Sequence, residues 1–363
     1  MKAAILHEAN HPLTIEDVEI EKPKRREVLL RTAFAGLCHS DLHFIEGLYS
    51  YLPMPVVLGH EAAAVVEAVG DDVTYVKPGD HVIACLSVFC GDCPQCMTGH
   101  TNLCENTEVK LLPGAARRLR WKGDVLHQGF NLSAFAEQML VHEHAVVKIK
   151  PEIPLDIATL IGCGVMTGVG AVFHAAKVEP GSTVAVIGCG GIGLSAVNGA
   201  AIAGAERIIA IDTIAEKLEK AREMGATDTI NASNVDPVVA VRELTGGGVP
   251  YSFEAIGLKK TAEQSFAMLR PGGVATIIGM IPFGVKIELH GADFLRDRKI
   301  QGTSMGGNHF RIDMPRLLEL WRQGRLQLET LISGRITLDK INEGFANLKS
   351  GAPVRQLIDF GVV

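Results

Sequence analysis

The sequence lacks several features that define large classes of proteins. It has no excess of positive charge, because 35 Lys and Arg stand against 41 Asp and Glu for a formal net charge of -6. A protein with this charge balance lacks the excess of basic residues that attracts nucleic acid or anionic lipid. We find no internal repeat and no low-complexity tract. The first residues, Met1 to Leu6, run into acidic and polar side chains before an export leader could form, so we expect a protein that is not exported. The expected partner is a small molecule, with no nucleic acid and no membrane.

Charge is also missing from the stretch between Pro180 and Ala205. A hydropathy window could read such a stretch as a membrane span. It contains many glycines, together with Ser195 and Asn198, and glycine weakens a membrane helix. A buried strand, a turn and a helix fit these residues better.

The eight cysteines are unevenly spread, since half of them fall between Cys90 and Cys104. In a chain of this size without a leader, such clustering indicates metal binding before disulfide bonding. We therefore expect reduced thiols and a cytoplasmic protein.

The order of expected elements predicts two domains in a chain of 363 residues. Short apolar runs broken by Gly, Pro and Asp predict an all-β lobe from Lys2 to about Val147. After about Thr167, apolar strands alternate with helical stretches, which predicts an α/β fold with a doubly wound parallel sheet. The strands are expected at 183–187, 207–211, 228–230, 251–255 and 274–278, and the helices at 192–203, 215–224, 237–244 and 261–269. Later helices are expected at 314–323 and 338–348, in a tail that returns to the first lobe.

A glycine motif follows the first of these strands. Gly188, Gly190, Gly191, Ile192 and Gly193 match the G-x-G-x-x-G pattern, in which a helix amino terminus faces a pyrophosphate at close range. Asp212 ends the next strand, about twenty residues further on. A carboxylate there accepts hydrogen bonds from ribose hydroxyls and repels a 2′-phosphate, so we expect NAD rather than NADP. The alternative is that Asp212 only caps the following helix.

Cys90, Cys93, Cys96 and Cys104 form a second pattern, in a loop rich in Gly and Pro. Four thiolates close a tetrahedral zinc and leave no position for substrate, so this zinc would be structural. An iron–sulfur cluster also accepts four cysteines, although its usual spacings differ.

Cys38, His60 and Cys163 are candidates for a catalytic metal site. Two thiolates and one imidazole are three protein ligands, which leave a fourth position for water or an alcohol. Taken singly, each residue has a structural interpretation as a buried cysteine or a core histidine. Their spacing alone cannot join them.

At these motifs the chain resembles the zinc-containing alcohol dehydrogenases of the medium-chain dehydrogenase/reductase family, over nearly its whole length. Further segments carry the resemblance, from Val69 to Val73, from Lys77 to Val82 and from Leu160 to Gly168. It implies a GroES-like catalytic domain (residues 1–164 and 305–363, with a structural zinc lobe at about 88–106) and a Rossmann NAD-binding domain (residues 165–304). It also implies two Zn²⁺ per chain, with Cys38, His60 and Cys163 on the catalytic ion. The family glycine at position 64 is replaced by Ala64, which changes no ligand.

The same resemblance implies roles for several other residues. Ser40 resembles the hydroxyl that touches the substrate oxygen, and His43 the relay member that reaches solvent. Asp41 and Glu61 resemble carboxylates beside the metal ligands, Asp41 orienting His60, and Glu61 is also a candidate metal residue. The expected cofactor contacts outside the glycine motif are His39, Lys217 and Arg355. A surface salt bridge is the alternative for Arg355, while Cys85 and Cys189 match no ligand position.

The implied function is hydride transfer between a primary or secondary alcohol, or its aldehyde or ketone, and NAD, through a zinc-bound alkoxide and a Ser/His proton relay. A zinc-free quinone or enone reductase would not need the three ligands, and an NAD-binding regulatory protein would not need the relay. The stretch between Cys104 and Ser133 resembles the longer-chain branch, which includes class III and aryl-alcohol enzymes. Leu86, Leu112 and Met280 are candidates for the substrate pocket. A homodimer is expected, with a homotetramer as the alternative.

Overall fold

The computed structural model describes residues 1–110, 118–351 and 355–362, and the chain divides into two compact units. Unit 1 comprises Met1–Cys163, His309–Glu319 and Leu328–Val363, and unit 2 comprises Gly164–Asn308 and Leu320–Gln327. The pocket candidate Leu112 lies outside the described residues.

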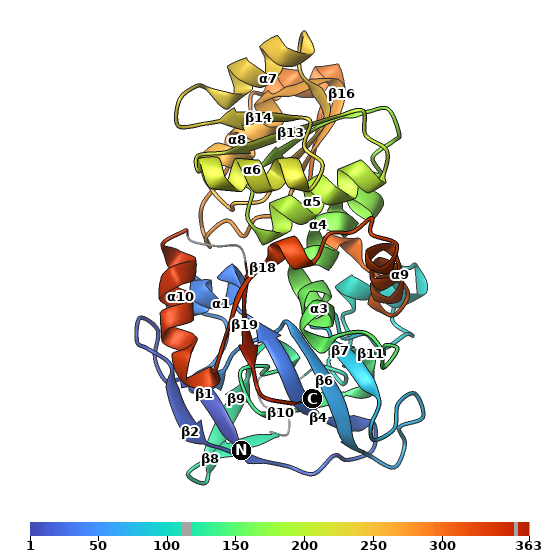
Figure 1. Ribbon diagram of the computed structural model, residues 1–363, viewed down its shortest axis with the longest axis vertical. Coiled ribbons are helices and arrows are strands. Elements are labelled where there is room, and N and C mark those ends of the chain that lie inside the picture. Colours follow the sequence, from blue (N-terminus) through green and yellow to red (C-terminus); the bar gives the residue numbers. More distant parts are fainter. Residues whose placement is uncertain (111–117, 352–354, 363) are drawn as a thin grey trace. The chain divides into compact units, whose positions relative to one another are not determined.

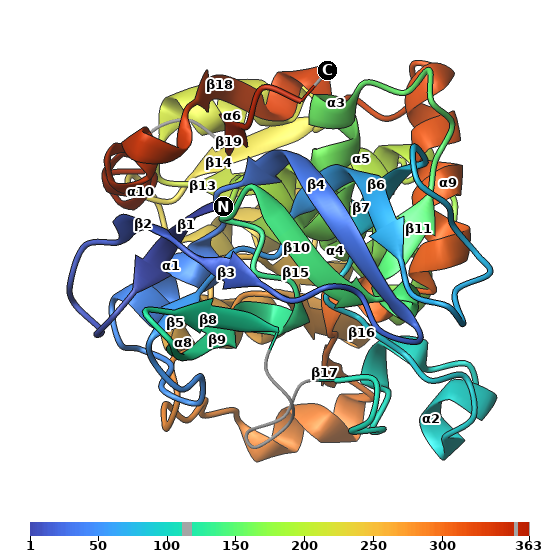
Figure 2. The same ribbon diagram turned by 90° about the horizontal axis from the view of Figure 1, so that it is seen from below.

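Unit 1 is built on two sheets. In the described chain, the first has the strand order β2-β1-β5-β9-β8-β3, and the second has the order β11-β7-β6-β4-β19-β18, with β10 paired to β4. Figure 2 shows β4, β6, β7 and β11 side by side. The strands are β1 (Lys2–Leu6), β2 (Thr14–Asp17), β3 (Glu19–Ile20), β4 (Glu27–Gly36), β5 (Val56–Val57), β6 (Ala62–Val69), β7 (His81–Ala84), β8 (Leu119–Trp121), β9 (Asp124–Gln128), β10 (Gln138–His142), β11 (Val146–Lys148), β18 (Ile332–Ile336) and β19 (Arg355–Asp359).

The prediction of an all-β first lobe was wrong in one respect. Helix α1 (His39–Ile45) interrupts the strands, and it buries Asp41, Leu42 and Phe44. Only seven residues form it, too few for helical periodicity to stand out from the surrounding short apolar runs. The other α-helices described within the first 160 residues are α2 (Pro94–Met97) and α3 (Leu155–Leu160). The later helices α9 (Phe310–Arg322) and α10 (Ile341–Lys349) were both predicted.

Unit 2 contains the predicted parallel sheet, with the strand order β14-β13-β12-β15-β16-β17 in the described residues. All its pairings are parallel. Helices α5 and α6 pack over β13, and α7 and α8 pack over β15, as in a doubly wound fold (Figure 1). The elements are β12 (Thr183–Ile187), β13 (Arg207–Asp212), β14 (Asp228–Asn231), β15 (Val249–Glu254), β16 (Leu269–Ile277), β17 (Lys299–Gly302), α4 (Met166–Gly170), α5 (Gly191–Ile202), α6 (Ala215–Glu223), α7 (Pro237–Thr245) and α8 (Lys259–Ala267).

The uncharged stretch after Pro180 is a buried strand, turn and helix, as predicted. Among the described residues a different helical stretch, Leu155–Ala176, is long and apolar enough to cross a membrane, but 94% of its most apolar window is buried. Buried helices of folded units pass the same test, so this stretch is weak support for a membrane span.

Candidate metal centres and cofactor site

Three predicted metal ligands meet in the interior of unit 1. Cys38 directly precedes α1, His60 lies between β5 and β6, and Cys163 lies in the helical turn Ile161–Val165. Their ligand atoms lie within 4.8 Å of one another, and His60 Nε2 is 3.2 Å from Cys163 Sγ. All three side chains are buried. Two sulfurs and one nitrogen at this separation fit a tetrahedral zinc with one position left open.

The surroundings of Cys38 favour the ionised form of its thiol. A hydrogen bond from Cys163, together with the nearby positive charges of Arg355 and His60, holds the pKa of the Cys38 thiol well below its usual range despite burial. The lowered pKa favours the thiolate of Cys38, the form that coordinates metals. A bound cation would favour the same form at Cys163.

Asp41 holds the imidazole of His60. Its carboxylate oxygens lie 3.3 Å and 3.2 Å from His60 Nδ1, and Oδ1 also accepts a hydrogen bond of 2.9 Å from the Gly59 amide. Burial raises the pKa of Asp41, and the attraction of His60 opposes this effect. The contact through Nδ1 directs Nε2 toward Cys163, which is the orientation that a metal ligand needs.

We expect Asp41→Asn to weaken the metal site without unfolding the chain. The amide keeps the size of the carboxylate but loses its charge, and removing such a partner of a ligating histidine costs about 10- to 100-fold in metal affinity or activity. Competition with a chromophoric chelator measures the affinity, and Asp71→Asn, on an exposed loop, is the matched control. Unchanged zinc affinity in Asp41→Asn would show that the carboxylate does not orient the ligand.

Glu61 and Arg355 form a buried ion pair beside the three ligands. Arg355 Nη1 lies 3.3 Å from a Glu61 carboxylate oxygen and donates a 3.0 Å hydrogen bond to the Leu37 carbonyl. Burial raises the pKa of Glu61 to about 7 although Arg355 lowers it. The Arg355 side chain is only 7% exposed, so its ion pair is not the surface salt bridge considered above. Glu61 is not one of the three clustered ligands, and its direct contact with a metal stays a prediction.

The remaining predicted residues of this region lie on α1. Ser40 Oγ is 3.7 Å from Cys38 Sγ, whereas His39 is exposed at the first position of the helix. His43 is half-buried, and burial lowers the pKa of its imidazole. Its Nδ1 has no hydrogen-bond partner within the described part of the chain. A neutral imidazole of this kind can accept a proton.

Phe130 is a neighbour of the metal ligands that was not predicted from the sequence. The ring of Phe130 lies over that of His60, with centroids 4.6 Å apart. Phe130 has a positive φ of 55°, a conformation that is uncommon for a bulky residue. No motif marks it in the sequence, because the contact joins residues far apart in the chain.

The four clustered cysteines surround a second site around α2. The sulfur of Cys90 lies 3.9 Å from that of Cys96 and 3.6 Å from that of Cys104, and the sulfurs of Cys93 and Cys104 are 3.9 Å apart. Zinc–sulfur bonds of about 2.3 Å in a tetrahedron place the sulfurs about 3.8 Å apart. A hydrogen bond from the Glu105 amide lowers the pKa of Cys93 to about 6. The geometry therefore fits a closed zinc site.

The glycine motif has the geometry of a dinucleotide loop. Gly188 has a φ of 93°, and a Cβ on Gly193 would lie 1.6 Å from the Gly188 carbonyl oxygen, so neither tolerates a side chain. A Cβ on Gly190, the residue before α5, would meet nothing within 4 Å. The motif thus combines a tight turn with open space at a helix amino terminus, as a pyrophosphate requires.

Asp212 reaches from the end of β13 to this loop. Oδ2 accepts a 2.7 Å hydrogen bond from the Cys189 amide, and Oδ1 accepts one of 3.0 Å from the Ile214 amide next to α6. The carboxylate therefore binds the residue before α6 and the glycine loop, whereas the helix itself has no side-chain cap, so the capping alternative is not supported. An ionised carboxylate has about four acceptor positions, so some remain for ribose hydroxyls. Lys217 follows in α6 and is half-buried.

A parallel-sheet unit with a dinucleotide loop and a β-rich unit with two cysteine-based metal sites together define a zinc-dependent nicotinamide oxidoreductase. Comparisons with known proteins agree. Residues 24–151 match the alcohol dehydrogenase GroES-like domain, and residues 191–322 match the zinc-binding dehydrogenase domain. Alcohol dehydrogenase 1 of Pisum sativum is 35% identical over 98% of this chain and 96% of its own. The chain belongs to the zinc-containing alcohol dehydrogenases of the medium-chain dehydrogenase/reductase family.

Solved structures give the same result. An alcohol dehydrogenase zinc-binding domain protein from Burkholderia ambifaria is 37% identical with a TM-score of 0.93, covering 99% of this chain and 98% of its own. Benzyl alcohol dehydrogenase from Acinetobacter calcoaceticus is 32% identical with the same TM-score and coverage. A zinc-binding dehydrogenase from Sinorhizobium meliloti, solved with NADP, is 29% identical with a TM-score of 0.83 over 99% of this chain and 98% of its own. The family thus uses zinc and a nicotinamide cofactor.

Proposed function

We propose that the protein transfers hydride between a primary or secondary alcohol and NAD at the site of Cys38, His60 and Cys163. The observation that carries this proposal is the buried cluster of three ligand side chains among the described residues, since three ligands leave the open position that catalysis needs. NADH formation from a panel of alcohols tests it. A zinc-loaded protein that binds NAD but forms no NADH with any of them would contradict it.

We propose two zinc ions per chain. When bound by Cys38, His60 and Cys163, zinc would act as a Lewis acid that makes a hydroxyl group acidic near neutral pH. The cysteines around α2 would hold a second, structural ion. Their sulfur separations and the lowered pKa of Cys93 support this assignment.

The side chains of α1 provide a route for the hydroxyl proton. Ser40 would accept it from the alcohol, and His43 would pass it to water, so neither acts as the primary base. Two observations support this route. Ser40 lies close to Cys38, and Nδ1 of half-buried His43 has no hydrogen-bond partner among the described residues. Asp41 orients His60, and the ion pair of Glu61 with Arg355 balances the charge behind the ligands.

Ser40→Ala tests this proton route. We expect kcat/KM for alcohol oxidation to fall by about 100-fold, the lower end of the contribution of general acid–base groups, with the zinc content unchanged. His43→Ala should give a similar loss. A Ser40→Ala enzyme with wild-type kcat/KM would remove Ser40 from the route.

We propose NAD rather than NADP as the cofactor, bound by the glycine motif with Asp212 and Lys217. The Asp212 carboxylate, fixed by two backbone amides, would lie where a 2′-phosphate brings like charge, and such an approach costs several kcal/mol. His39 and Arg355 remain candidate contacts to the cofactor phosphates. For Arg355 such a contact would have to coexist with its Glu61 ion pair.

Asp212→Gly should erode the preference for NAD by about 10-fold or more, because the repulsion of the 2′-phosphate is lost. The ratio of kcat/KM values for NAD and NADP measures the preference, and Asp228→Asn, at the start of the neighbouring strand β14, is the control. An unchanged ratio in Asp212→Gly would refute the assignment.

The substrate class is proposed from a solved relative, and the assembly from the resemblance of the stretch between Cys104 and Ser133 to the longer-chain, often dimeric branch. We propose an aromatic or other bulky alcohol, because benzyl alcohol dehydrogenase matches almost the whole chain, and a homodimer, with a homotetramer as the alternative. Residues 1–164 and 305–363 would form the catalytic domain and residues 165–304 the NAD-binding domain. The eight free cysteines support a reducing, cytoplasmic setting. A screen of aliphatic, allylic and aromatic alcohols and of thiol adducts of formaldehyde identifies the substrate class.

A further inference from the structure

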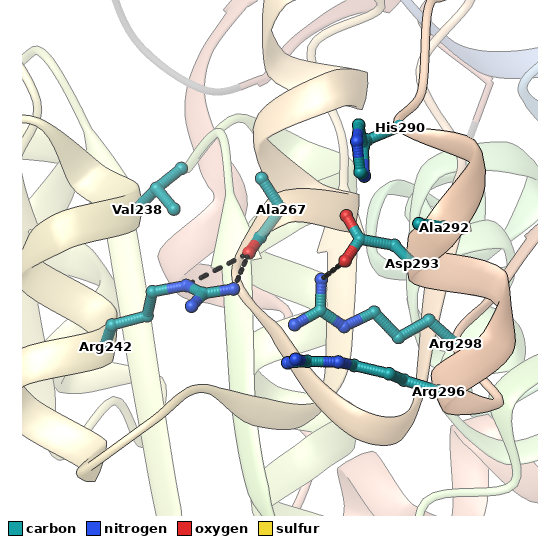
Figure 3. A pocket seen from close by; sticks show the side chains of 8 residues that line it. All are labelled: Val238, Arg242, Ala267, His290, Ala292, Asp293, Arg296 and Arg298. Atoms are coloured by element: carbon teal, nitrogen blue, oxygen red, sulfur yellow. Dashed lines mark hydrogen bonds and ion pairs between the residues drawn. The ribbon is translucent and has the colours of Figure 1, made fainter.

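A cavity of about 450 Å³ lies in unit 2, away from the glycine motif. It is lined by residues of α7, by Ala267 at the end of α8 and by the segment from His290 to Arg298 (Figure 3). Strands β16 and β17 begin at Leu269 and Lys299, so the cavity lies at the edge of the sheet where these strands start. The glycine motif follows the end of β12, at the opposite edge. Because ligands of such sheets bind at the carboxyl ends of the strands, this cavity is separate from the cofactor site.

Positive charge dominates the cavity. Arg242, Arg296 and Arg298 line it, and Asp293 is its only acidic lining residue. Figure 3 shows Arg242 on one side and Arg296 and Arg298 on the other, with their guanidinium groups pointing toward one another. Guanidinium groups keep their charge at any physiological pH. Their mutual repulsion is unfavourable unless an anion lies between them.

Arg298 is the most informative of the three. Its side chain is only 4% exposed, and Nη1 lies 3.0 Å from an Asp293 carboxylate oxygen. Its Nε is buried without a hydrogen-bond partner in the described part of the chain. A buried donor of a charged group is costly when left unsatisfied. A residue of this kind in the wall of a cavity points to a ligand that supplies the missing acceptor.

Arg242 and Arg296 differ in how many of their N–H groups can still donate to a ligand. Arg242 donates from Nε and Nη2 to the Ala267 carbonyl, at 3.2 Å and 2.7 Å. Its Nη1 remains for another acceptor. Arg296 is exposed and makes no hydrogen bond or ion pair within the described residues, so all its donors remain. His290 lines the cavity beside them and adds a further polar group.

We propose that this cavity binds a small polyanion that carries phosphate or carboxylate groups. The planar fork of a guanidinium matches the two oxygens of either group. Three arginines against one carboxylate leave a net charge that suits an anion of two or more negative charges. The site does not depend on the proposed dehydrogenase activity, because its residues lie at the other edge of the sheet.

Isothermal titration calorimetry of the zinc-loaded, NAD-saturated protein tests the proposal. Inorganic phosphate is the first probe and tricarballylate the second, so that the two arms distinguish a phosphate site from a carboxylate site. Saturation with NAD excludes binding of either probe at the glycine motif. We expect one binding site per chain for at least one probe. The absence of binding of both probes, at low ionic strength, would overturn the proposal.

Arg296→Gln locates the site, because this exposed side chain makes no hydrogen bond or ion pair with the residues that the structure describes. We expect its Kd for the bound probe to rise by about 10-fold, the effect of losing one charge-assisted hydrogen bond. Arg298→Lys keeps the buried charge but loses the fork, and should raise the Kd as well. Arg222→Gln on α6 removes an equal charge on a helix that packs over β13 and should leave the Kd unchanged. Equal Kd values for Arg296→Gln and the wild type would contradict the assignment.

Discussion

Replacing Cys38 by Ser is expected to abolish turnover while the four-cysteine site keeps its zinc. Serine is a poor ligand for zinc compared with a thiolate, and the remaining two ligands, His60 and Cys163, hold the ion weakly. A bound zinc lowers the pKa of water to about 7, so its loss leaves the alcohol neutral. We expect kcat/KM to fall by about 10⁴-fold or more, with zinc falling from two ions per chain to one. Steady-state kinetics and elemental analysis measure both.

Cys85→Ala is the matched control for this variant. Cys85 is also fully buried in unit 1, and burial raises the pKa of its thiol to about 11, so it is an inert cysteine. We expect this enzyme to keep two zinc ions and its turnover. Wild-type turnover in a Cys38→Ser protein that has lost one zinc would refute the catalytic role of the three-ligand site.

Replacing Cys96 by Ser is expected to have its largest effect on stability. Structural zinc contributes about 10–16 kcal/mol to the folding of small zinc domains, and one lost thiolate of four removes a part of it. A loss of about 4 kcal/mol lowers Tm by about 8–16 °C in a domain of this size. Scanning calorimetry measures Tm, and elemental analysis measures the zinc that remains.

Cys189→Ala is a suitable comparison for Cys96→Ser, because Cys189 is buried, belongs to no cluster, and has a pKa raised by burial. It should keep both ions. Iron in place of zinc in the wild-type protein would indicate that the four cysteines hold an iron–sulfur cluster. An unchanged Tm and zinc content in Cys96→Ser would contradict a structural zinc at this position.

Periodicity and turn residues predicted unit 2 well. Helix α4 and strand β17 of this unit were not predicted. The strand from Thr183 to Ile187 has the predicted bounds, and helices α5, α6, α7 and α8 differ from prediction by one or two residues at their ends. These segments are continuous apolar strands and helices of nine residues or more, for which local pattern is a strong signal. Helix α1 was missed because it has only seven residues, and Asp41 is buried in it beside Leu42 and Phe44.

The site was predictable in composition but not in assembly. The four cysteines lie close in sequence, so spacing alone indicated their cluster. Cys38, His60 and Cys163 come from three separate segments, and only the family resemblance joined them before the structure placed their ligand atoms within 4.8 Å. The pairing of Arg355 with Glu61 spans most of the chain. Such contacts depend on tertiary packing, which no local pattern encodes.

Cys38, His60 and Cys163 are proposed to bind a zinc ion with an open coordination position. Diffraction from crystals of the zinc-loaded protein, measured on both sides of the zinc absorption edge, tests this proposal most directly. We predict two anomalous peaks per chain, one among the four cysteines and one among these three side chains, the latter with a non-protein fourth ligand. A peak at the four cysteines alone, with the three side chains ordered and nothing between them, would contradict the account.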